Sequence, residues 1–533
     1  MGQRHLGSVL TLVAVALAGN PIPLSISSPS NASEPIRESF VSFSIEFSSF
    51  PDFAGNSSTP NNFSYNLLTN LGAIQGSNPI IRVGGNTQDY ATYDANQEEA
   101  LVGTVNVNRS RDYPTTISIG PSYFDSYNTW PGFQYLHGFN LGKNGSAGYD
   151  TLVGTVPLVC KVLTSDKLAF FTLGNEPDLF KTSAQGPVRP AGWDESDYVA
   201  EYLNKTRTMR QIVERDCPAV IEQGKFRFYS PSFAGTSNSL NIIKTFSSGL
   251  DTDQEIAFID SHNYIGGATQ PGVTLQHTLM NHTSTVLSVN KHLNETTLLR
   301  DTGLPYLLGE TNSLYKLTKP SDSQGAPALS NSFGAALWGV DFNLYCAATG
   351  IARVHMHQGT NYRYASWQPM STPNETIGTK APYYGNIAVA SFLGDLTSGN
   401  TSVANIDLDS IYNAAYAAYV NDRLERIALI QMQAYNYTES RSNDERPSEA
   451  FSFTLPSDYG VKEVSVQRLM ANGSNAITGI TYDGVSYNYE LDEGLPVPQD
   501  NATTGEILKV SEEGVVEVEV PWSSAAVLQL KWD

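Results

Sequence analysis

Residues 168–178 read Leu-Ala-Phe-Phe-Thr-Leu-Gly-Asn-Glu-Pro-Asp, an apolar run that opens into an amide and an acid. A short, continuous apolar run of this kind is typical of a strand buried on both faces, as in a parallel sheet. Pro177 has no backbone N–H for a further ladder bond, so the strand ends before it. The stretch therefore predicts a parallel strand that delivers Asn175 and Glu176 to its carboxyl end.

A second stretch follows the same plan. Residues 305–313 read Pro-Tyr-Leu-Leu-Gly-Glu-Thr-Asn-Ser, so that a short apolar strand leads through a glycine to Glu310. The carboxyl ends of the strands of a parallel barrel open on one face, where the reactive side chains of barrel enzymes lie. We therefore expect Glu176 and Glu310 to meet there. Taken alone, either acid is also consistent with a cap on the following helix.

Outward from these two strands, short β-branched and aromatic runs alternate with helical patterns from about residue 40 to residue 394. The expected strands are Val41–Phe47, Pro79–Val83, Thr115–Ile119, Leu168–Leu173, Lys225–Ser230, Ala257–Ser261, Pro305–Leu308 and Gly350–His355. The helical patterns include Ala147–Leu163, Glu195–Arg215, Ser239–Phe246, Thr274–His292 and Ser330–Thr349. This alternation predicts a parallel (β/α)8 TIM barrel, which we assign to residues 35–395.

The pattern changes after residue 399, where short alternating runs are separated by turn residues. These runs are Arg426–Gln433, Ala450–Thr454, Glu463–Leu469, Val485–Tyr489, Ile507–Val510, Gly514–Val520 and Ala525–Trp532. They are typical of a β-sandwich, which we assign to residues 399–533, with Pro35–Glu38 as a candidate for one further strand. The predicted fold class is therefore α/β, a (β/α)8 barrel with a C-terminal β-sandwich domain.

The composition excludes several classes of protein. The 533 residues are 40% hydrophobic and only 16% charged, as in a folded globular protein and unlike a disordered or coiled-coil chain. With 32 basic against 53 acidic residues, the net charge is −21 and the pI is near 4.8. Such a chain repels phosphate backbones and anionic membrane surfaces, so we expect neither a nucleic acid nor a membrane as a partner.

The first residues have the pattern of a signal peptide. Arg4 and His5 precede an apolar run, Leu6–Ala18, that ends in a small-x-small cleavage pattern. This run is shorter than the roughly 20 apolar residues needed to cross a bilayer. We therefore expect residues 1–18 to be removed and the mature protein to be soluble and extracellular. A secretory route would expose thirteen Asn-x-Ser/Thr sequons to glycosylation, and the candidates are Asn56, Asn62, Asn108, Asn204, Asn281, Asn294 and Asn436.

Cysteine and histidine give no metal-site pattern. Cys160, Cys217 and Cys346 allow one disulfide and one free thiol, and their spacing is not that of a zinc site. His355 and His357 form a His-x-His pair with no third ligand nearby. We expect no metal and no cofactor. The lack of a Gly-x-Ser-x-Gly motif disfavours a serine hydrolase.

Two carboxyl groups at the mouth of one barrel are what glycoside hydrolysis needs. One carboxyl group protonates the departing oxygen, and the other attacks or stabilises the anomeric carbon. The pairing of Glu176 with Glu310 therefore indicates a glycosidase.

The wider set of motifs resembles the retaining glycoside hydrolases of the large (β/α)8 clan, and most closely glycoside hydrolase family 79. The motifs are Val41-Ser-Phe-Ser-Ile-Glu46-Phe, Arg82-Val-Gly-Gly-Asn86-Thr, Phe139-Asn-Leu-Gly142, Leu173-Gly-Asn175-Glu176-Pro-Asp, His262-Asn-Tyr264 and Leu308-Gly-Glu310-Thr-Asn-Ser. The resemblance covers nearly all of the mature chain. It implies a fungal secreted β-glucuronidase, related to heparanases, with a barrel and a C-terminal β domain.

By this resemblance, Glu176 is the general acid/base and Glu310 is the nucleophile. Asn175 then binds the 2-hydroxyl of the sugar, and Tyr264 donates a hydrogen bond to the nucleophile. Because Glu176 must start protonated, its pKa should be raised, whereas Glu310 should be held ionised. A retaining enzyme of this kind should have its two carboxyl groups about 5–5.5 Å apart.

Binding of a uronic acid requires donors that meet its carboxylate. By the same resemblance, Tyr315 after the seventh strand and Tyr362 after the eighth hold this carboxylate, with His355 beside them. Each tyrosine is also consistent with a packed loop aromatic. Glu46 is expected to bind sugar hydroxyls or, alternatively, to be a buried acid paired with Arg82.

The expected activity is exo cleavage of terminal β-D-glucuronosyl groups, including 4-O-methylated ones, from glycans such as arabinogalactan. The chain is acidic and has only isolated basic residues, unlike the basic clusters with which heparan-cleaving enzymes bind sulfates. Three alternatives remain open: another retaining β-glycosidase of the clan, such as a β-xylosidase or β-glucosidase; a heparanase-like endo-β-glucuronidase; and a non-catalytic carbohydrate-binding protein.

Overall fold

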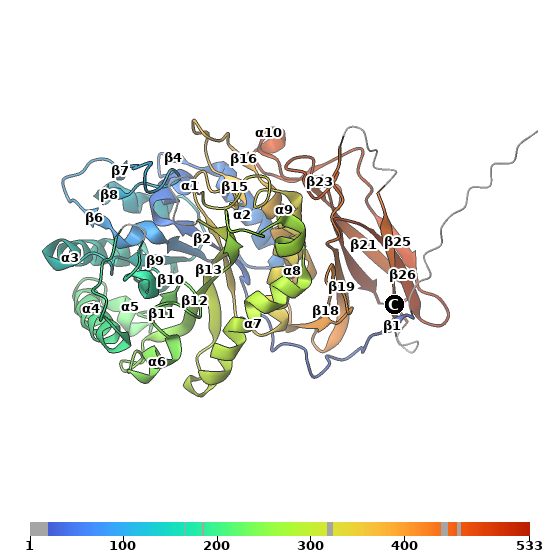
Figure 1. Cartoon of the computed structure of the whole chain (residues 1–533), viewed down its shortest axis with the longest axis horizontal. Helices are drawn as coiled ribbons and strands as arrows, with labels where there is room; N and C mark the ends of the chain where they lie inside the picture. Colours follow the sequence, from blue (N-terminus) through green and yellow to red (C-terminus); the bar gives the residue numbers. More distant parts are fainter. Residues whose placement is uncertain are drawn as a thin grey trace, which may run out of the picture.

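The computed structural model describes residues 20–164, 166–183, 186–316, 323–438, 446–455 and 460–532. The predicted signal peptide, residues 1–18, lies outside these ranges. Figure 1 shows a helix-wrapped barrel and a β domain that lie side by side. Within the described ranges, no helix is both long enough and apolar enough to cross a membrane.

Eight parallel strands form the barrel, and pairing of the last with the first closes the ring. The strands are β2 (Val41–Glu46), β5 (Ile81–Gly84), β9 (Tyr135–Phe139), β10 (Leu168–Leu173), β11 (Phe228–Phe233), β12 (Ile256–Gly267), β13 (Tyr306–Tyr315) and β14 (Val354–Gln358). They follow one another around the barrel in chain order. The predicted barrel is thereby confirmed, with β10 and β13 as its fourth and seventh strands.

Helices cover the outside of the barrel. They are α1 (Phe50–Ala54), α2 (Asn62–Gln75), α3 (Gly145–Val162), α4 (Glu195–Asp216), α5 (Pro218–Glu222), α6 (Ile242–Ser247), α7 (His282–Leu298), α8 (Phe333–Ala348) and α9 (Ala381–Leu393). α8 is buried along its whole length and α9 along almost all of it. Their burial follows from their place between the barrel and the β domain (Figure 1).

The third barrel strand differs from the prediction. Thr116–Ile119 does form a strand, β8, but it pairs with β6 (Ala91–Tyr93) and β7 (Leu101–Thr104) in a small sheet outside the barrel. Every residue of β9 is buried, whereas β8 alternates between less and more exposed positions, as a strand covered on one face does. β9 escapes sequence prediction because His137 and Gly138 interrupt its apolar run.

The predicted helix Thr274–His292 is interrupted. A single turn, η5 (Leu275–Leu279), is followed by α7, which starts at His282. The side chain of Asn281 caps α7 by accepting a hydrogen bond from the backbone N–H of Ser284. Among the seven glycosylation candidates, Asn281 is therefore half-buried, and the other six are exposed.

The β domain is a sandwich of two sheets. The larger sheet contains β17 (Thr401–Ile406), β18 (Asn413–Val420), β19 (Arg423–Gln431), β27 (Ser524–Lys531), β21 (Glu463–Met470), β22 (Thr481–Tyr482), β23 (Val485–Ser486), β24 (Val497–Pro498) and β25 (Glu506–Lys509). The smaller sheet contains β1 (Ile22–Pro23), β20 (Ser448–Thr454) and β26 (Val515–Pro521). Apolar side chains of both sheets share one core, so the predicted sandwich is confirmed. β18 escapes sequence prediction because half of its residues are alanine, which is depleted in strands.

The N-terminal segment adds a strand to the β domain at a different place from the one predicted. Ile22–Pro23, and not Pro35–Glu38, forms the added strand, which pairs in parallel with β20. Further along, the backbone N–H groups of Ser33 and Ile36 donate to carbonyls of β17 at 2.9 and 2.7 Å. Pro35 lies between these two donors and has no N–H of its own, so a regular ladder cannot form there.

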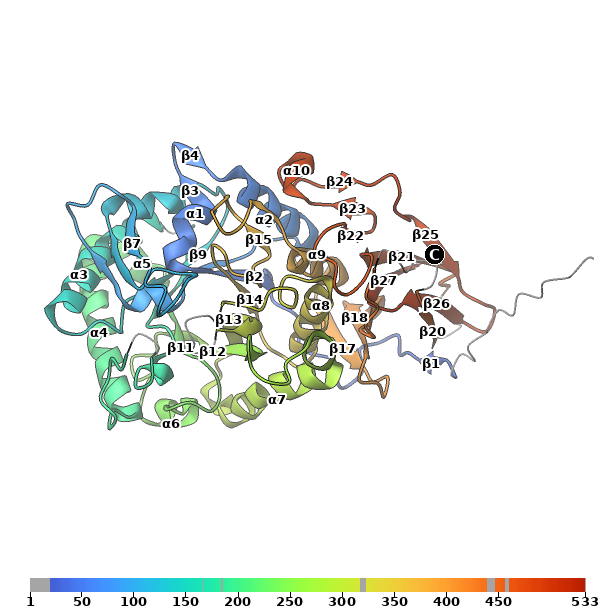
Figure 2. The ribbon, with the colours of Figure 1, turned by 45° about the horizontal axis from the view of Figure 1, so that its top comes forward.

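Further links hold the parts together. A disulfide joins Cys160 in α3 to Cys217 at the end of α4, and Cys346 is a buried free thiol, as the odd number of cysteines requires. A short helix of the β domain, α10 (Tyr489–Asp492), reaches back beside α2 of the barrel (Figure 2). There the side chain of Asn66 donates to a backbone carbonyl just after α10, at 3.0 Å.

Candidate active site

A cavity of about 750 Å³ opens at the carboxyl ends of the barrel strands. Its lining includes Asn175 and Glu176 after β10, His262 and Tyr264 of β12, and Glu310 and Tyr315 of β13. The strand-end rule that placed the two acids on one face therefore holds. This volume lies within the range of roughly 300–1,000 Å³ that is typical of sites for small ligands.

The two glutamates face each other across this cavity. One carboxylate oxygen of Glu176 and one of Glu310 lie within 4.8 Å of each other. Glu176 has a left-handed backbone, with φ of 52°, and its N–H donates to the carbonyl of Ser232 on β11 at 2.9 Å. Non-glycine residues seldom adopt this conformation, and they do so mostly where the surrounding structure holds them.

The surroundings of Glu310 favour its charged form. Arg82 Nη1 and the Tyr264 hydroxyl each donate to its carboxylate at 2.8 Å, and His357 Nδ1 lies 3.6 Å away. Burial opposes the charge, but the neighbouring His357, His262 and Arg82 outweigh it, so the pKa of Glu310 is lowered.

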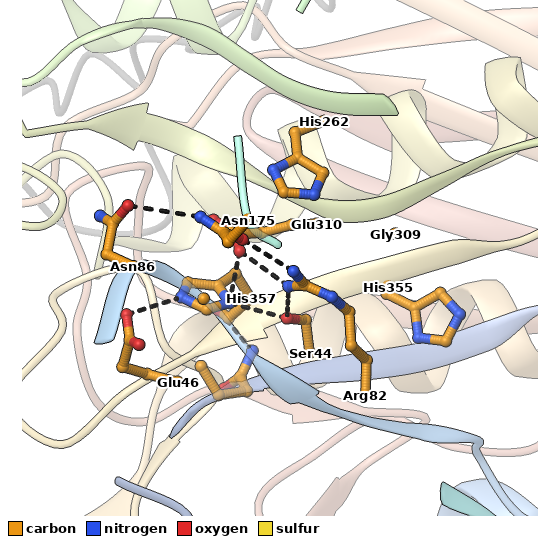
Figure 3. A network of polar contacts seen from close by, with 12 residues as sticks. Ser44, Glu46, Arg82, Asn86, Asn175, His262, Gly309, Glu310, His355 and His357 are labelled. Atoms are coloured by element: carbon orange, nitrogen blue, oxygen red, sulfur yellow. Dashed lines mark hydrogen bonds and ion pairs between the residues drawn. The ribbon is translucent and has the colours of Figure 1, made fainter. Parts of the chain in front are cut away.

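Arg82 is the central cation of this network, and it is fully buried (Figure 3). Besides Glu310, its guanidinium donates to Ser44 Oγ at 2.8 Å and to Asn175 Oδ1 at 2.7 Å. The contact with Asn175 fixes that amide with its oxygen toward Arg82. The Asn175 Nδ2 donor is thereby turned away from Arg82, toward Asn86 on the cavity lining at 3.4 Å.

The surroundings of Glu176 favour its neutral form instead. Burial and the negative charge of Glu310 raise the pKa of Glu176, against the smaller opposing effect of Arg82. His262 Nδ1 lies 3.0 Å from Glu176 Oε1. Burial lowers the pKa of His262 to about 4, so the imidazole is neutral near pH 7. A neutral imidazole accepts a hydrogen bond from the protonated carboxyl of Glu176 at this distance.

Glu46 does not pair with Arg82, which corrects one of the two expectations for it. Its Oε1 accepts hydrogen bonds from the backbone N–H and the hydroxyl of Thr87 and from Phe47 N–H, and its Oε2 accepts one from the Tyr362 hydroxyl at 3.0 Å. Glu46 is only 1% exposed and is absent from the cavity lining. Donors from the segments that follow β2, β5 and β14 satisfy this acid, and Arg82 pairs with Glu310 instead.

The residues expected at the uronate lie in different environments. Tyr315 lines the cavity and is 40% exposed at its rim. Tyr362 is fully buried, with its hydroxyl on Glu46, and does not line the cavity. His355 is also fully buried and lies apart from Glu310 (Figure 3), and its Nδ1 is 3.3 Å from the carbonyl of Phe43. The expectation that Tyr362 and His355 contact the substrate carboxylate is therefore corrected, because packing keeps both side chains behind the cavity wall.

Sequence reasoning missed two polar residues that support the site. His357 lies between Glu46 and Glu310 and contacts Ser44 Oγ at 2.9 Å (Figure 3). Alternation along β14 was the available signal, because it puts His355 and His357 on the same inner face. The second residue is Asp89, whose buried carboxylate accepts backbone N–H bonds from Leu141, Gly142 and Asn175.

Comparisons with known sequences agree on one family. A model of the glycosyl hydrolase family 79 C-terminal beta domain matches residues 415–527. A protein of Aspergillus niger named beta-glucuronidase is 55% identical over 525 residues, which cover 96% of this chain and 94% of that protein. A Neurospora crassa protein of the same name is 52% identical over 532 residues, with 94% and 93% covered.

Comparisons with solved structures point the same way. A 4-O-α-L-rhamnosyl-β-D-glucuronidase from Fusarium oxysporum, solved as a Rha-GlcA complex, superposes with a TM-score of 0.75 and 26% identity over 96% of this chain and 100% of that chain. A family 51 α-L-arabinofuranosidase from Bifidobacterium longum has a TM-score of 0.60 at 10% identity, over 95% and 99%. At that identity, the second likeness concerns the fold alone.

Proposed function

The chain belongs to glycosyl hydrolase family 79, and on that premise we propose that it is a secreted exo-β-D-glucuronidase that retains anomeric configuration. The observation that carries this proposal is the pair of glutamates within 4.8 Å of each other, one with a raised and one with a lowered pKa. Retaining enzymes keep their carboxyl groups about 5–5.5 Å apart, whereas inverting enzymes need about 6.5–9.5 Å to admit a water molecule.

In the first step, the ionised carboxylate of Glu310 attacks the anomeric carbon. The bond from this carbon to the glycosidic oxygen breaks, and Glu176 transfers its proton to that oxygen, so that the aglycone leaves as an alcohol. A glucuronosyl ester of Glu310 remains. Arg82 and Tyr264 hold the attacking carboxylate in place before the step, which lowers the entropic part of its barrier.

In the second step, Glu176 is a carboxylate and accepts a proton from water. The hydroxide that forms attacks the anomeric carbon from the side that the aglycone left, and the ester bond to Glu310 breaks. Glucuronic acid leaves with its original configuration, and both glutamates return to their starting states. The Asn175 amide donates to the 2-hydroxyl of the sugar in both steps, because its Oδ1 is already held by Arg82.

The substrate carboxylate binds beside Tyr315. This is the one of the expected uronate ligands that lines the cavity, and its partly exposed ring leaves the hydroxyl within reach of a ligand. A hydroxyl donor suits an anion in a protein whose net charge of −21 would otherwise repel it.

We infer exo action from contacts between loops at the cavity. Asp112, which precedes the cavity-lining Tyr113, accepts hydrogen bonds from Arg363 Nη1 at 2.5 Å and from the Gln324 N–H at 2.7 Å. These contacts tie the loop between β7 and β8 to the loops after β13 and β14. Loops joined in this way favour a terminal glucuronosyl or 4-O-methylglucuronosyl group, as on arabinogalactan, over the interior of a chain.

Secretion is supported by the signal-peptide pattern, by the disulfide and by the exposed sequons. The protein is expected in the medium, starting near residue 19, with a mobility that increases after treatment with an N-glycosidase. Recovery of the protein only from the cytosol, with residues 1–18 still attached, would contradict this part of the proposal.

The experiment that tests the activity is release of p-nitrophenol from the β-D-glucuronide, beside the β-glucoside and the β-xyloside. We expect turnover of the glucuronide alone, with the β anomer as the first product by NMR. Glu310→Ala should lose this activity, and Glu214→Ala, an exposed acid on α4, should keep it. Turnover of a neutral glycoside would favour another β-glycosidase of the clan. If the folded protein releases no p-nitrophenol from any of the three substrates, an endo enzyme or a binding protein would be favoured.

A further inference from the structure

Asp260 is a buried acid that the proposed chemistry does not use. It lies on β12, two residues before His262, and is fully buried. Its Oδ1 accepts a hydrogen bond from the backbone N–H of Gly309 at 2.8 Å, and its Oδ2 accepts one from the Ser232 hydroxyl at 2.5 Å. One carboxylate thus bridges the two strands on either side of its own, β11 and β13.

Both partners of Asp260 are residues that the strand pairing skips. Ser261 pairs with Leu308 and His262 with Glu310, so Gly309 is an extra residue on β13. On the other side, Pro231 pairs with Asp260 and Phe233 with Ser261, which leaves Ser232 as an extra residue on β11. Bulges of this kind leave the extra residue without a ladder partner and re-aim the side chains that follow. The carboxylate of Asp260 binds both extra residues.

The bulge on β13 aims the nucleophile. Gly309 directly precedes Glu310, and a Cβ atom at Gly309 would come within 2.3 Å of Asp260 Oδ1. Only glycine therefore permits this approach while Asp260 stays in place. The hydrogen bond from Gly309 fixes the backbone one residue before the attacking carboxylate.

The bulge on β11 aims the acid/base. Ser232 has a left-handed backbone, with φ of 57°, and its carbonyl accepts the N–H of Glu176 at 2.9 Å. Glu176 is itself left-handed, with φ of 52°. Ser232 and Glu176 are thus hydrogen-bonded to each other and both have this sparsely populated backbone conformation. Such conformations persist only where surrounding contacts hold them, and the bond from the Ser232 hydroxyl to Asp260 is one such contact.

We propose that Asp260 is a positioning residue that sets the separation between the carboxyl groups of Glu176 and Glu310. The inference rests on the proposed function only for its effect on rate. Fold stability alone is a poor reason for this acid, since a well-packed apolar residue often replaces a buried charge without loss of stability. Its two partners instead adjoin the two glutamates whose separation decides between retention and inversion.

The test compares Asp260→Ala and Asp260→Asn with Asp341→Ala. Asn keeps an acceptor for Gly309 and can donate to Ser232 Oγ, whereas Ala keeps neither bond. Asp341 is an equally buried acid on α8, bound by Tyr416 and His282, and does not line the cavity. We expect Asp260→Ala to lower kcat about 100-fold with KM within about twofold, because a misplacement of roughly 1 Å has such a cost.

Asp260→Asn should recover kcat to within about tenfold of wild type, and Asp341→Ala should lower the melting temperature but not kcat. Crystal structures supply a readout that needs no substrate: the distance between the two carboxyl groups should lengthen by roughly 1 Å in Asp260→Ala. An unchanged distance, or equal losses of kcat in Asp260→Ala and Asp341→Ala, would overturn the inference. If wild type hydrolyses no glycoside, the proposed function fails, and the distance still decides the role of Asp260.

If Asp260→Ala does not fold, Ser232→Ala replaces it. This variant deletes one hydroxyl and leaves the bond from Gly309 intact. We expect about a tenfold loss of kcat and a small lengthening of the distance between the carboxyl groups, since one of the two buried hydrogen bonds that hold the bulges is lost. Wild-type kcat and wild-type geometry in Ser232→Ala would overturn the inference equally.

Discussion

Glu176 after β10 and Glu310 within β13 are reached in a similar way, through an apolar run and a glycine, yet the two acids are held in opposite states. Burial and the charge of Glu310 raise the pKa of Glu176, whose Oε1 lies 3.0 Å from the neutral imidazole of His262. Glu310 accepts hydrogen bonds from Arg82 and Tyr264 on two other strands, and His357 on a third strand lies 3.6 Å away. The proton affinity of each acid is therefore decided by side chains remote in sequence, and not by the strand that carries it.

The largest effect on this contrast is expected when the negative charge of Glu310 is removed. We expect Glu310→Gln to lower kcat on a β-glucuronide by about 10⁴-fold or more, because the first step loses its nucleophile. The pKa of Glu176 should fall at the same time, since a neighbouring negative charge is gone. Steady-state kinetics and a titration of Glu176 by ¹³C NMR measure the two effects.

Glu295→Gln is the matched control for this prediction. Glu295 is another buried acid, and burial raises its pKa to about 7, but it binds Tyr306 and does not line the cavity. Its amide variant should keep wild-type kcat. Activity of Glu310→Gln within tenfold of wild type would assign the attack to another group.

The next disturbance removes the cation that distinguishes the two sites. Arg82→Leu should lower kcat/KM by about 10²–10³-fold, because breaking a buried ion pair costs about 3–5 kcal/mol. Arg82 stabilises the charged form of Glu310, so without it Glu310 takes up a proton at a higher pH. The acid limb of the pH profile should therefore move to higher pH. Arg82→Lys keeps the charge but loses one of the two contacts to Glu310 and Asn175. Its kcat/KM should therefore lie between those of wild type and Arg82→Leu. An unmoved acid limb in Arg82→Leu would contradict the assignment.

A smaller disturbance acts on the protonated side. His262→Ala removes the acceptor for the proton of Glu176, so the pKa of Glu176 should fall and the basic limb should move to lower pH. Near neutral pH the loss should be about tenfold, the size expected for one buried hydrogen bond. His137→Ala is the control: this histidine is equally buried, and its ring contacts Tyr127. A basic limb that moves equally in both variants would show a general effect of packing.

The smallest effect on activity is expected from the disulfide. Replacing Cys160 and Cys217 with serine opens a link across 57 residues, which should lower stability by about 4 kcal/mol in the loop-entropy account. Neither residue lines the cavity, so kcat at 25 °C should not change. Thermal melting and kinetics of the same preparation check both statements. A fall in kcat as large as that of His262→Ala would mean that the link also shapes the site.

Local features of the site were predictable from sequence, and long-range ones were not. Asn175 and Glu176 could be placed because Pro177 marks the end of their strand locally. Glu310 could be placed from the apolar run and glycine before it, although β13 continues past it to Tyr315. The partner of Arg82 could not be predicted, because it depends on how far each side chain reaches across the barrel. The sequence suggested Glu46 as a partner of Arg82, whereas in the structure other donors satisfy Glu46 and Arg82 pairs with Glu310.

The fold shows the same division. Regular apolar strands such as β10 were predictable, whereas β9 was not, because His137 and Gly138 interrupt its apolar run. Tyr362 illustrates the limit for function: a tyrosine in a loop at the catalytic face can point into the cavity or away from it, and only packing decides. The bulges at Ser232 and Gly309 likewise depend on the pairing between strands, which no single segment encodes.

The burial of α8 and α9 has a consequence for how this gene can be cut and recombined. Both helices are apolar on the side that faces the β domain as well as on the side that faces the barrel. The Arg426 side chain of β19 also donates to the last carbonyls of α9, at 2.6 and 2.9 Å. A shortened gene that ends after α9 would therefore encode a barrel with a large exposed apolar surface, which we expect to aggregate. The change of sequence pattern near residue 399 marks a boundary of architecture, but the buried faces of α8 and α9 make the folding of the barrel depend on the β domain.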